Sequence, residues 1–220
     1  MEDKKYFSRQ IDESLMAWKN STRHKPLLLR GARQVGKSSS VRHLAKQFDN
    51  FVEINFERKP AYLEIFKGDR DAKHIVEMIK SITGEPIVPG KTLLFFDEIQ
   101  MCQEAISSLR FFWEDMPGLH VIAAGSLLEF ALSEIPTFGV GRIHSMFMYP
   151  MSFDEFLNAL GMFSLQKYKR EASPEKPLLS ALHEQLVSLF RTYLMVGGMP
   201  ESVSTWVDTH SYVACQAVQK

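Results

Sequence analysis

The chain has 220 residues, and 45% of them are hydrophobic, which is enough for one sizeable core or for a core with a smaller satellite domain. Lysine plus arginine and aspartate plus glutamate number 26 each, and this balance argues against a surface dominated by binding to nucleic acid or to an anionic membrane. The two cysteines have no metal-ligand spacing, and no apolar run approaches the roughly 18 residues of a membrane span, so we expect a soluble protein of the reducing cytoplasm.

Between residues 25 and 150, short apolar runs alternate with amphipathic helical segments. The predicted strands cover residues 26–31, 51–56, 92–98, 119–126 and 142–150, and the predicted helices cover 37–48, 71–82, 105–113 and 127–133. This alternation indicates an α/β fold, a three-layer sandwich in which a mostly parallel five-stranded sheet is covered on both faces. We expect residues 1–24 to form a helical segment that packs on this core.

The remaining residues, 151–220, predict a smaller helical region, either a lid or the start of a C-terminal domain. Ser152 and Glu155 have the spacing of a capping box at the start of a helix. The polar stretch 166–177 is interpreted as a mobile linker or a surface loop. Apolar residues then recur at helical period over 178–196, until the glycines of "GGMP" end the helix.

The segment "GARQVGKSSS" has the Walker A spacing G-x-x-x-x-G-K-S, the pattern of a P-loop whose backbone N–H groups surround a phosphate. It follows an apolar strand and begins an amphipathic helix, as that mechanism requires. Lys37 would reach the β- and γ-phosphates, and the Ser38 hydroxyl would bind Mg²⁺. The alternative is a glycine-rich turn with a solvated lysine. The residues expected to line the nucleotide are Gly31, Ala32, Arg33, Gln34, Val35, Gly36, Lys37, Ser38 and Ser39.

Two adjacent carboxylates, Asp97 and Glu98, end the apolar run "TLLFFDE" and are expected at the carboxyl edge of the sheet, where open α/β folds bind ligands. Asp97 is a candidate Walker B ligand of Mg²⁺ through water, and Glu98 is a candidate base for the attacking water. The alternative is that both acids begin a loop or cap the next helix. A water-activating glutamate favours hydrolysis, and the absence of an Asn-Lys-x-Asp element disfavours guanine, so ATP is the predicted substrate.

Five segments together resemble a known family: "LLLRGARQVGKSSS", "LLFFDEIQ", "VIAAGSLLEF", "VGRIHSMFMYPMSFDEF" and "YLMVGGMPESV". Their order is similar to that in prokaryotic AAA-like ATPases, described as predicted AAA+ superfamily ATPases, in which a DUF4143 region follows the ATPase domain. The resemblance extends from about Arg9 over nearly the whole chain. It implies a sheet of the additional-strand, catalytic-glutamate type, with the fourth strand between the P-loop strand and the acid-bearing strand. Because such proteins are longer, we expect this chain to be C-terminally truncated.

The resemblance also implies roles for three further residues. Ser126 is similar to a sensor that contacts the γ-phosphate or the attacking water, although it could instead cap the helix predicted at 127–133. Asn55 resembles the polar partner that holds the catalytic glutamate inactive until a ligand arrives, and the alternative is an ordinary polar residue at a strand end. Arg142 is the candidate for an arginine that stabilises negative charge in the transition state, in cis or from a neighbouring subunit. The alternative is a surface arginine after a glycine turn.

Three functions remain open at this point. The leading one is Mg²⁺-dependent ATP hydrolysis that moves the helical region or a bound partner. The second is a nucleotide-dependent binding module or scaffold for DNA or protein with negligible turnover, and the third is transfer of phosphate to a small hydroxyl substrate. A homo-oligomer and a DNA or protein partner bound through the C-terminal region are both compatible with the sequence, whereas a membrane partner is not expected.

Overall fold

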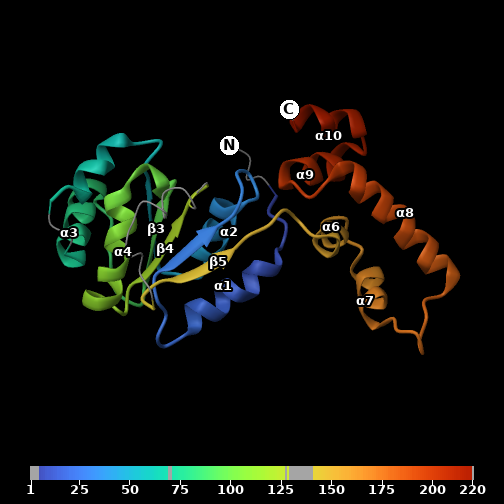
Figure 1. The fold of residues 1–220 in the computed structure, drawn as a ribbon, viewed down its shortest axis with the longest axis horizontal. Coiled ribbons are helices and arrows are strands. Elements are labelled where there is room, and N and C mark those ends of the chain that lie inside the picture. Colours follow the sequence, from blue (N-terminus) through green and yellow to red (C-terminus); the bar gives the residue numbers. More distant parts are fainter. Residues whose placement is uncertain (1–4, 69–70, 127, 129–140, 220) are drawn as a thin grey trace. The chain divides into compact units, whose positions relative to one another are not determined.

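The structure is a computed structural model that describes residues 5–68, 71–126, 128 and 141–219. Its contacts divide the chain into two compact units, Ile11–Met148 on one side and Met1–Gln10 with Tyr149–Lys220 on the other. The first unit contains the sheet, and the second is helical (Figure 1).

One sheet organises the first unit. Its strands are β1 (Leu27–Arg30), β2 (Asn50–Asn55), β3 (Thr92–Asp97), β4 (His120–Ala124) and β5 (His144–Phe147). They lie in the order β2-β3-β4-β1-β5, and all four neighbouring pairs are parallel. The α/β prediction with five mostly parallel strands is therefore confirmed, and β4 lies between the P-loop strand and the acid-bearing strand, as the family resemblance implied.

One helix precedes the first strand, and others connect the strands along the chain. They are α1 (Gln10–Asn20), α2 (Lys37–Ala45), α3 (Ala72–Thr83) and α4 (Gln103–Asp115), with 3₁₀ turns η1 (Pro60–Phe66) and η2 (Ile99–Met101). The ends of α3 follow from its sequence, because the Asp71 side chain accepts a hydrogen bond from the Lys73 N–H and Gly84 adopts the left-handed conformation after the last turn. The helix predicted at 127–133 lies outside the described residues except at Leu128.

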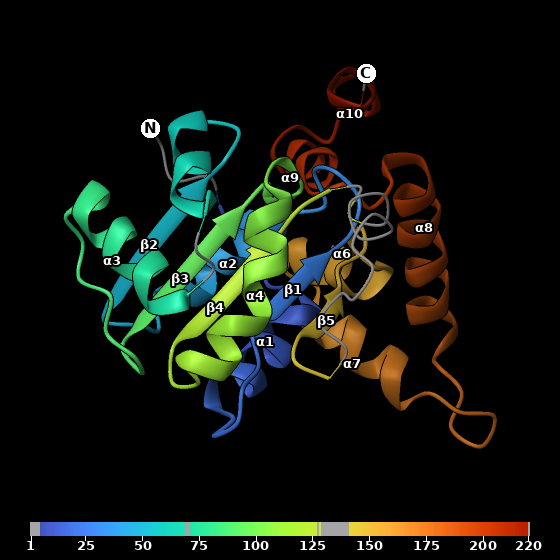
Figure 2. The same cartoon turned by 60° about the vertical axis from the view of Figure 1, so that its left-hand side comes forward.

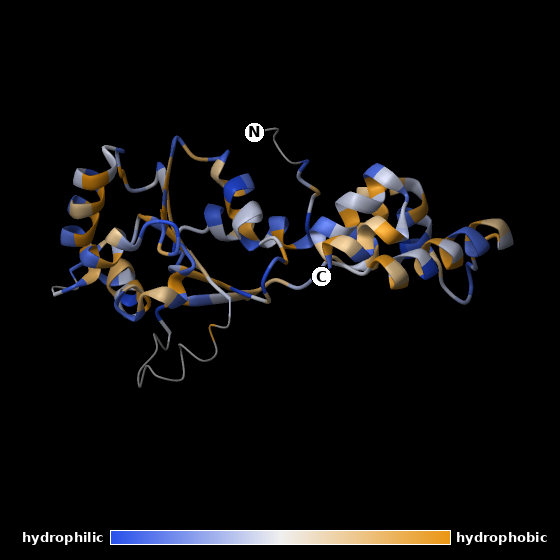
Figure 3. Ribbon diagram, turned by 90° about the horizontal axis from the view of Figure 1, so that it is seen from above, coloured by the Kyte–Doolittle hydropathy of each residue, from blue (hydrophilic) through white to orange (hydrophobic). Residues whose placement is uncertain are grey.

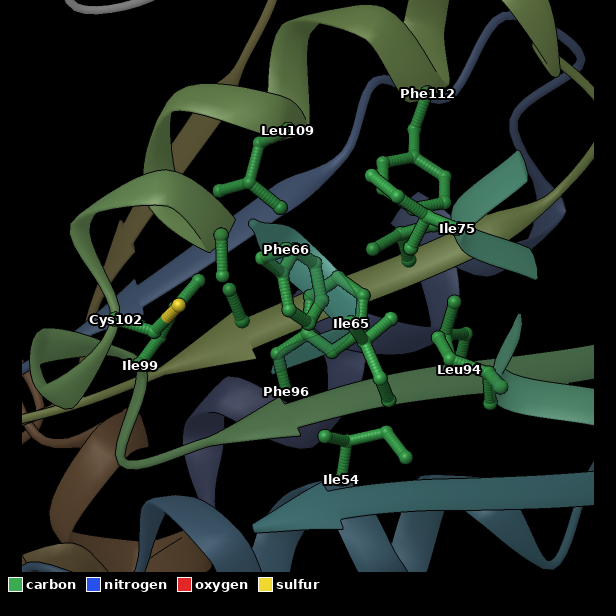
Figure 4. Packing of buried hydrophobic residues seen from close by; sticks show 14 of the residues in the cluster. Ile54, Ile65, Phe66, Ile75, Leu94, Phe96, Ile99, Cys102, Leu109 and Phe112 are labelled. Carbon is green, nitrogen blue, oxygen red and sulfur yellow. The ribbon is translucent and has the colours of Figure 1, made fainter. Parts of the chain in front are cut away.

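Large apolar side chains fill the space between the sheet and the helices α3 and α4. Phe96 points into this core, where its ring centroid lies 5.5 Å from that of Phe66 and 5.8 Å from that of Phe112 (Figure 4). Figure 2 shows α4 in front of the sheet and α2 behind it. Because helices cover both faces, all six residues of β3 are buried, and this burial explains why that strand is apolar until Asp97. Each such side chain contributes about 1.5–3 kcal/mol.

The second unit consists of short helices and one long one. They are α6 (Phe153–Ala159), α7 (Phe163–Glu171), α8 (Ser180–Val196), α9 (Pro200–Thr209) and α10 (Tyr212–Val218). Along the helices of the chain, hydrophobic and hydrophilic residues alternate from one side of the coil to the other, as amphipathic packing requires (Figure 3). No helix in the described part of the chain is long and apolar enough to cross a membrane.

The capping box predicted for α6 is present and also fastens the N-terminal segment. The Ser152 hydroxyl accepts from the Glu155 N–H, and the Glu155 carboxylate accepts from the Ser152 N–H. The same buried carboxylate pairs with Arg9, with 3.0 Å between Nε and Oε1, and accepts from the Gln10 N–H at 2.7 Å. Glu155 therefore joins residues that are more than 140 positions apart in the sequence.

The stretch 166–177, predicted as a mobile linker or a surface loop, is partly helical instead, since α7 continues to Glu171. Gln166 is buried and donates to the main-chain oxygen of Asp154, while Lys169 Nζ lies 2.9 Å from Asp154 Oδ1. The charged residues of this stretch are thus the polar side of a helix that is anchored to α6. Charge alone could not distinguish such a helix from a solvated loop.

Candidate functional site

The loop between β1 and α2 has the backbone geometry of a tight phosphate-binding turn. Gly31 and Gly36 have φ values of +146° and +101°, and Gln34 between them is also left-handed at 62°. A Cβ on Gly31 would lie only 2.1 Å from the main-chain oxygen of Met148, just after β5. Glycine is therefore required here both by the backbone angle and by the close approach of a second strand.

Lys37 is the first residue of α2, and its side chain folds back over the loop. Its Nζ donates to the main-chain oxygens of Gly31 at 2.9 Å and Ala32 at 2.7 Å. Burial lowers the pKa of the Lys37 amine, and the nearby carboxylates of Glu98 and Asp97 oppose this shift. The ammonium is thus held by carbonyl groups next to two acids.

Asp97 lies at the end of β3, almost fully buried, and receives hydrogen bonds at both oxygens. The Ser38 hydroxyl donates to Oδ1 at 2.8 Å, and Asn55 Nδ2 donates to Oδ2 at 3.0 Å. Arg42 lies 3.6 Å from Oδ2. Burial is the largest cause of the raised pKa of Asp97, which the bond from Ser38 opposes. This arrangement brings the Ser38 hydroxyl and the predicted metal-binding carboxylate into direct contact.

The structure places Asn55 on Asp97, whereas the resemblance implied a contact with the catalytic glutamate. The parallel register aligns Asn55 with Asp97, so its side chain meets the last residue of β3 rather than the one after it. The partner of Glu98 is instead Gln100, whose Nε2 donates to Glu98 Oε2 at 2.6 Å. Sequence reasoning missed Gln100. The only signal was its place in "DEIQ", two residues after Glu98, in a turn whose geometry the sequence does not specify.

Glu98 itself has an unusual backbone conformation. Glu98 directly precedes the 3₁₀ turn η2 and has φ 54° and ψ 43°. These angles lie in the left-handed region, which residues other than glycine rarely adopt. Its side chain makes no capping bond to this turn, which does not support the alternative that the acid is a helix cap. Such strain is typical of functional positions when neighbouring contacts enforce it.

Two further predicted residues lie at different places in the first unit. Ser126 is buried two residues after β4, and its hydroxyl accepts a hydrogen bond from Arg33 Nε of the loop at 3.3 Å. Arg142 is about half exposed and forms an ion pair with Glu114, with 2.6 Å between Nε and Oε1. Ser126 is thus joined to the phosphate loop, whereas Arg142 would have to leave Glu114 to reach a phosphate.

The oxygen atoms at this site suit a magnesium ion. A serine hydroxyl and an aspartate carboxylate, in contact at the end of a helix and a strand, supply the hard ligands that Mg²⁺ prefers alongside substrate phosphates. Within the described residues, no group of three or more histidine, cysteine, aspartate or glutamate side chains is arranged to hold another metal. The site thus combines a lysine ammonium, a serine hydroxyl and two carboxylates, of which the Ser38 hydroxyl and Asp97 are in direct contact.

Comparisons with known proteins agree with this geometry. The model of the AAA domain family matches residues 23–157, more than half of the chain. Among solved structures, PCH-2 of C. elegans is similar, with a TM-score of 0.56 and 12% identity over 97% of this chain and 70% of that chain. At this identity the likeness shows the fold alone, and no curated protein has significant sequence similarity to the chain. The match spans the phosphate loop, the acid-bearing strand and the sheet, and the chain therefore belongs to the AAA domain family of nucleotide-binding, ATPase-like proteins.

Proposed function

We propose that the protein binds ATP together with Mg²⁺ and hydrolyses it. The observation that carries this proposal is the contact between the Ser38 hydroxyl and Asp97, with Lys37 and Glu98 beside them. Lys37 and Ser38 begin α2, whereas Asp97 ends β3 and Glu98 directly follows it. Ser38 and Asp97 are 59 positions apart in the sequence. Together the four residues supply a cation, two metal ligands and a base. A glycine-rich turn without a ligand has no need of this combination.

Each residue of the site has a defined task in this proposal. Lys37 exchanges its bonds to the loop carbonyls for bonds to phosphate oxygens, and Ser38 and Asp97 are the residues that would hold Mg²⁺. The bound ion would neutralise charge on the β- and γ-phosphates. Glu98 orients a water molecule and accepts its proton while the water oxygen bonds to the γ-phosphorus, and the bond from that phosphorus to the bridging oxygen of ADP breaks.

The γ-phosphate is the group that distinguishes ATP from ADP in this site. Ser126 and Arg33, already in contact, are proposed to lie near it, and Arg142 is proposed to supply further positive charge in cis or to a neighbouring subunit. Only contacts that differ between the two nucleotides can shift a conformational equilibrium. We therefore propose that ATP hydrolysis changes the state of the helical unit or of a bound partner.

The wider setting of this activity is part of the same proposal. A homo-oligomer and a DNA or protein partner, bound through the region after residue 150, are the proposed assemblies, and a DUF4143-like role for that region remains a prediction. Cys102 and Cys215 are free and buried, which supports the proposed location in a reducing cytoplasm.

Steady-state ATP turnover by the wild type and by Glu98→Gln tests this function. We expect Mg²⁺-dependent turnover in the wild type and a loss of roughly 100-fold to 10,000-fold in the variant, since the base is removed and the shape is kept. Glu57→Gln, an exposed acid beyond β2, is the matched control and should turn over ATP like the wild type.

The two other function classes predict different results in this experiment. A scaffold would bind ATP with the same negligible turnover in both proteins, and its partner binding would not change in Glu98→Gln. A phosphotransferase would release ADP only when a hydroxyl acceptor is added. Either result would contradict hydrolysis as the activity.

A further inference from the structure

The side chain of Gln100 lies between the candidate base and the segment before Ser126. Its Nε2 donates to Glu98 Oε2 at 2.6 Å. The other end of the amide, Oε1, is buried and finds no hydrogen-bond donor among the described residues. A buried amide oxygen without a donor is unfavourable, so this placement needs a reason.

Gly125 supplies the space that Gln100 occupies. A Cβ at Gly125 would lie 2.2 Å from Gln100 Oε1, far inside van der Waals contact. Gly125 does not have a left-handed φ, so its backbone conformation would accept another residue. A methyl group at position 125 would therefore displace the end of the Gln100 side chain, and it would also come within 3.2 Å of Leu128 Cδ2. Gly125 directly precedes Ser126 in the chain.

The Gln100 amide also restricts what the Glu98 carboxylate can do. The bond from the Gln100 N–H group to Oε2 restrains the orientation of the carboxylate, and the second oxygen, Oε1, is left to accept a proton. The left-handed backbone at Glu98 sets the direction in which the side chain leaves the turn, and the bond from Gln100 favours one orientation of its carboxylate. Such orientation matters because a misplacement of about 1 Å can reduce a rate by roughly 100-fold.

We propose that Gln100 is the positioning residue for the base Glu98 and that Gly125 keeps Gln100 in place. This inference rests on the proposed hydrolysis of ATP, in which Glu98 is the base. Gln100 thus makes the contact with Glu98 that the resemblance implied for Asn55, which in this structure donates to Asp97, but its proposed role is to position the base and not to hold it inactive. Because Ser126 follows Gly125, the support of the base lies next to the residue that is expected to contact the γ-phosphate.

Gln100→Met tests the positioning role, because methionine has a similar length and volume but cannot donate to a carboxylate. We expect kcat to fall roughly tenfold to 100-fold, with KM for ATP, affinity for ADP and thermal stability unchanged. A role in packing alone would leave kcat at the wild-type value in this variant. A joint loss of nucleotide affinity and thermal stability would overturn the proposal in favour of a structural role.

A double-mutant cycle tests the contact with Gly125. Gly125→Ala alone should lower kcat about as much as Gln100→Ala, since its methyl group displaces the amide. In the Gln100→Ala background the same methyl group meets no amide and only its contact with Leu128 remains, so adding Gly125→Ala should lower kcat less than it does in the wild type. Fully additive effects would overturn the proposed contact.

The wild type and Glu98→Gln are measured beside these variants to separate the two proposals. An active wild type whose kcat is unchanged by Gln100→Met and Gln100→Ala would overturn the positioning role and leave hydrolysis standing. Equal turnover by the wild type and Glu98→Gln would overturn both, because Glu98 would then not be the base that Gln100 positions.

Discussion

The Lys37 ammonium donates two hydrogen bonds to carbonyl groups of its own loop. We expect these bonds to be replaced by bonds to phosphate oxygens when a nucleotide binds. Lys37→Ala should weaken ATP binding roughly tenfold to 100-fold, because hydrogen bonds to a charged group contribute about 1.5–3 kcal/mol. Titration calorimetry with ATP measures the effect. Lys46→Ala, an exposed lysine at the end of the same helix, is the control, and equal ATP affinity of Lys37→Ala and the wild type would refute the phosphate cradle.

His120, at the start of β4, gives the first unit a predictable response to acid. Its ring stacks on that of His24, with centroids 3.7 Å apart, and lies against Trp18 and Phe48. Burial lowers the pKa of His120 to about 4, and the charges of His24 and Lys19 act in the same direction, while a hydrogen bond to the Lys19 carbonyl opposes it.

The sign of the effect follows from the two protonation states. The unfolded chain has the ordinary histidine pKa of 6.5 and binds the proton more tightly than the folded chain. Stability should therefore fall as the pH is lowered from about 6.5 towards 4, by up to about 1.4 kcal/mol per pH unit from this group. Urea unfolding at several pH values should show a smaller loss for His120→Phe, while the exposed control His74→Phe should behave like the wild type.

The contacts between individual side chains were harder to predict from the sequence than the strands and helices were. Lys37, Ser38, Asp97 and Glu98 follow from local spacing and from the rule that strand ends meet at one edge of the sheet. The contact of Glu98 with Gln100 could not be predicted in this way. It depends on the geometry of the turn after β3 and on the space that Gly125 leaves just after β4.

At the scale of elements, the loop after β1 depends on the end of β5. Gly31→Ala should destabilise the first unit by several kcal/mol and abolish ATP binding, since its methyl group would lie 2.1 Å from the Met148 oxygen at a φ of +146°. Thermal unfolding and ATP titration measure both effects. Gly118→Ala, whose methyl group would meet Pro89 at an ordinary 3.5 Å, is the matched control, and equal stability of the two variants would contradict this explanation.

Elements with a strong apolar period, and α6 with its capping box, were predictable, whereas a helix anchored by scattered polar contacts was not. The strand β3 is buried on both faces and reads as a strand from its composition alone. In contrast, the part of α7 that lies within 166–177 was predicted as a linker or a surface loop, because its buried anchor Gln166 and its contacts to Asp154 come from side chains that are also common in loops.

At the scale of the whole molecule, the alternation of strands and helices was enough to predict a parallel sheet. The strand order was not, since spacing cannot tell where the fourth strand inserts, and only the family resemblance implied the observed order. That order places the ends of β1, β3 and β4 side by side, so the loop, the acids and Ser126 meet at one edge. We propose that ATP is hydrolysed at this edge of the sheet.

A single-turnover experiment with protein in excess over ATP tests that claim most directly. Acid-quenched samples give the ratio of ADP to ATP over time, and filter binding gives the fraction of nucleotide bound. We predict that the wild type converts bound ATP to ADP in a Mg²⁺-dependent manner, whereas Glu98→Gln binds the ATP and leaves it intact. Conversion by Glu98→Gln at the wild-type rate, or ATP that stays intact on the wild type, would contradict the proposed hydrolysis.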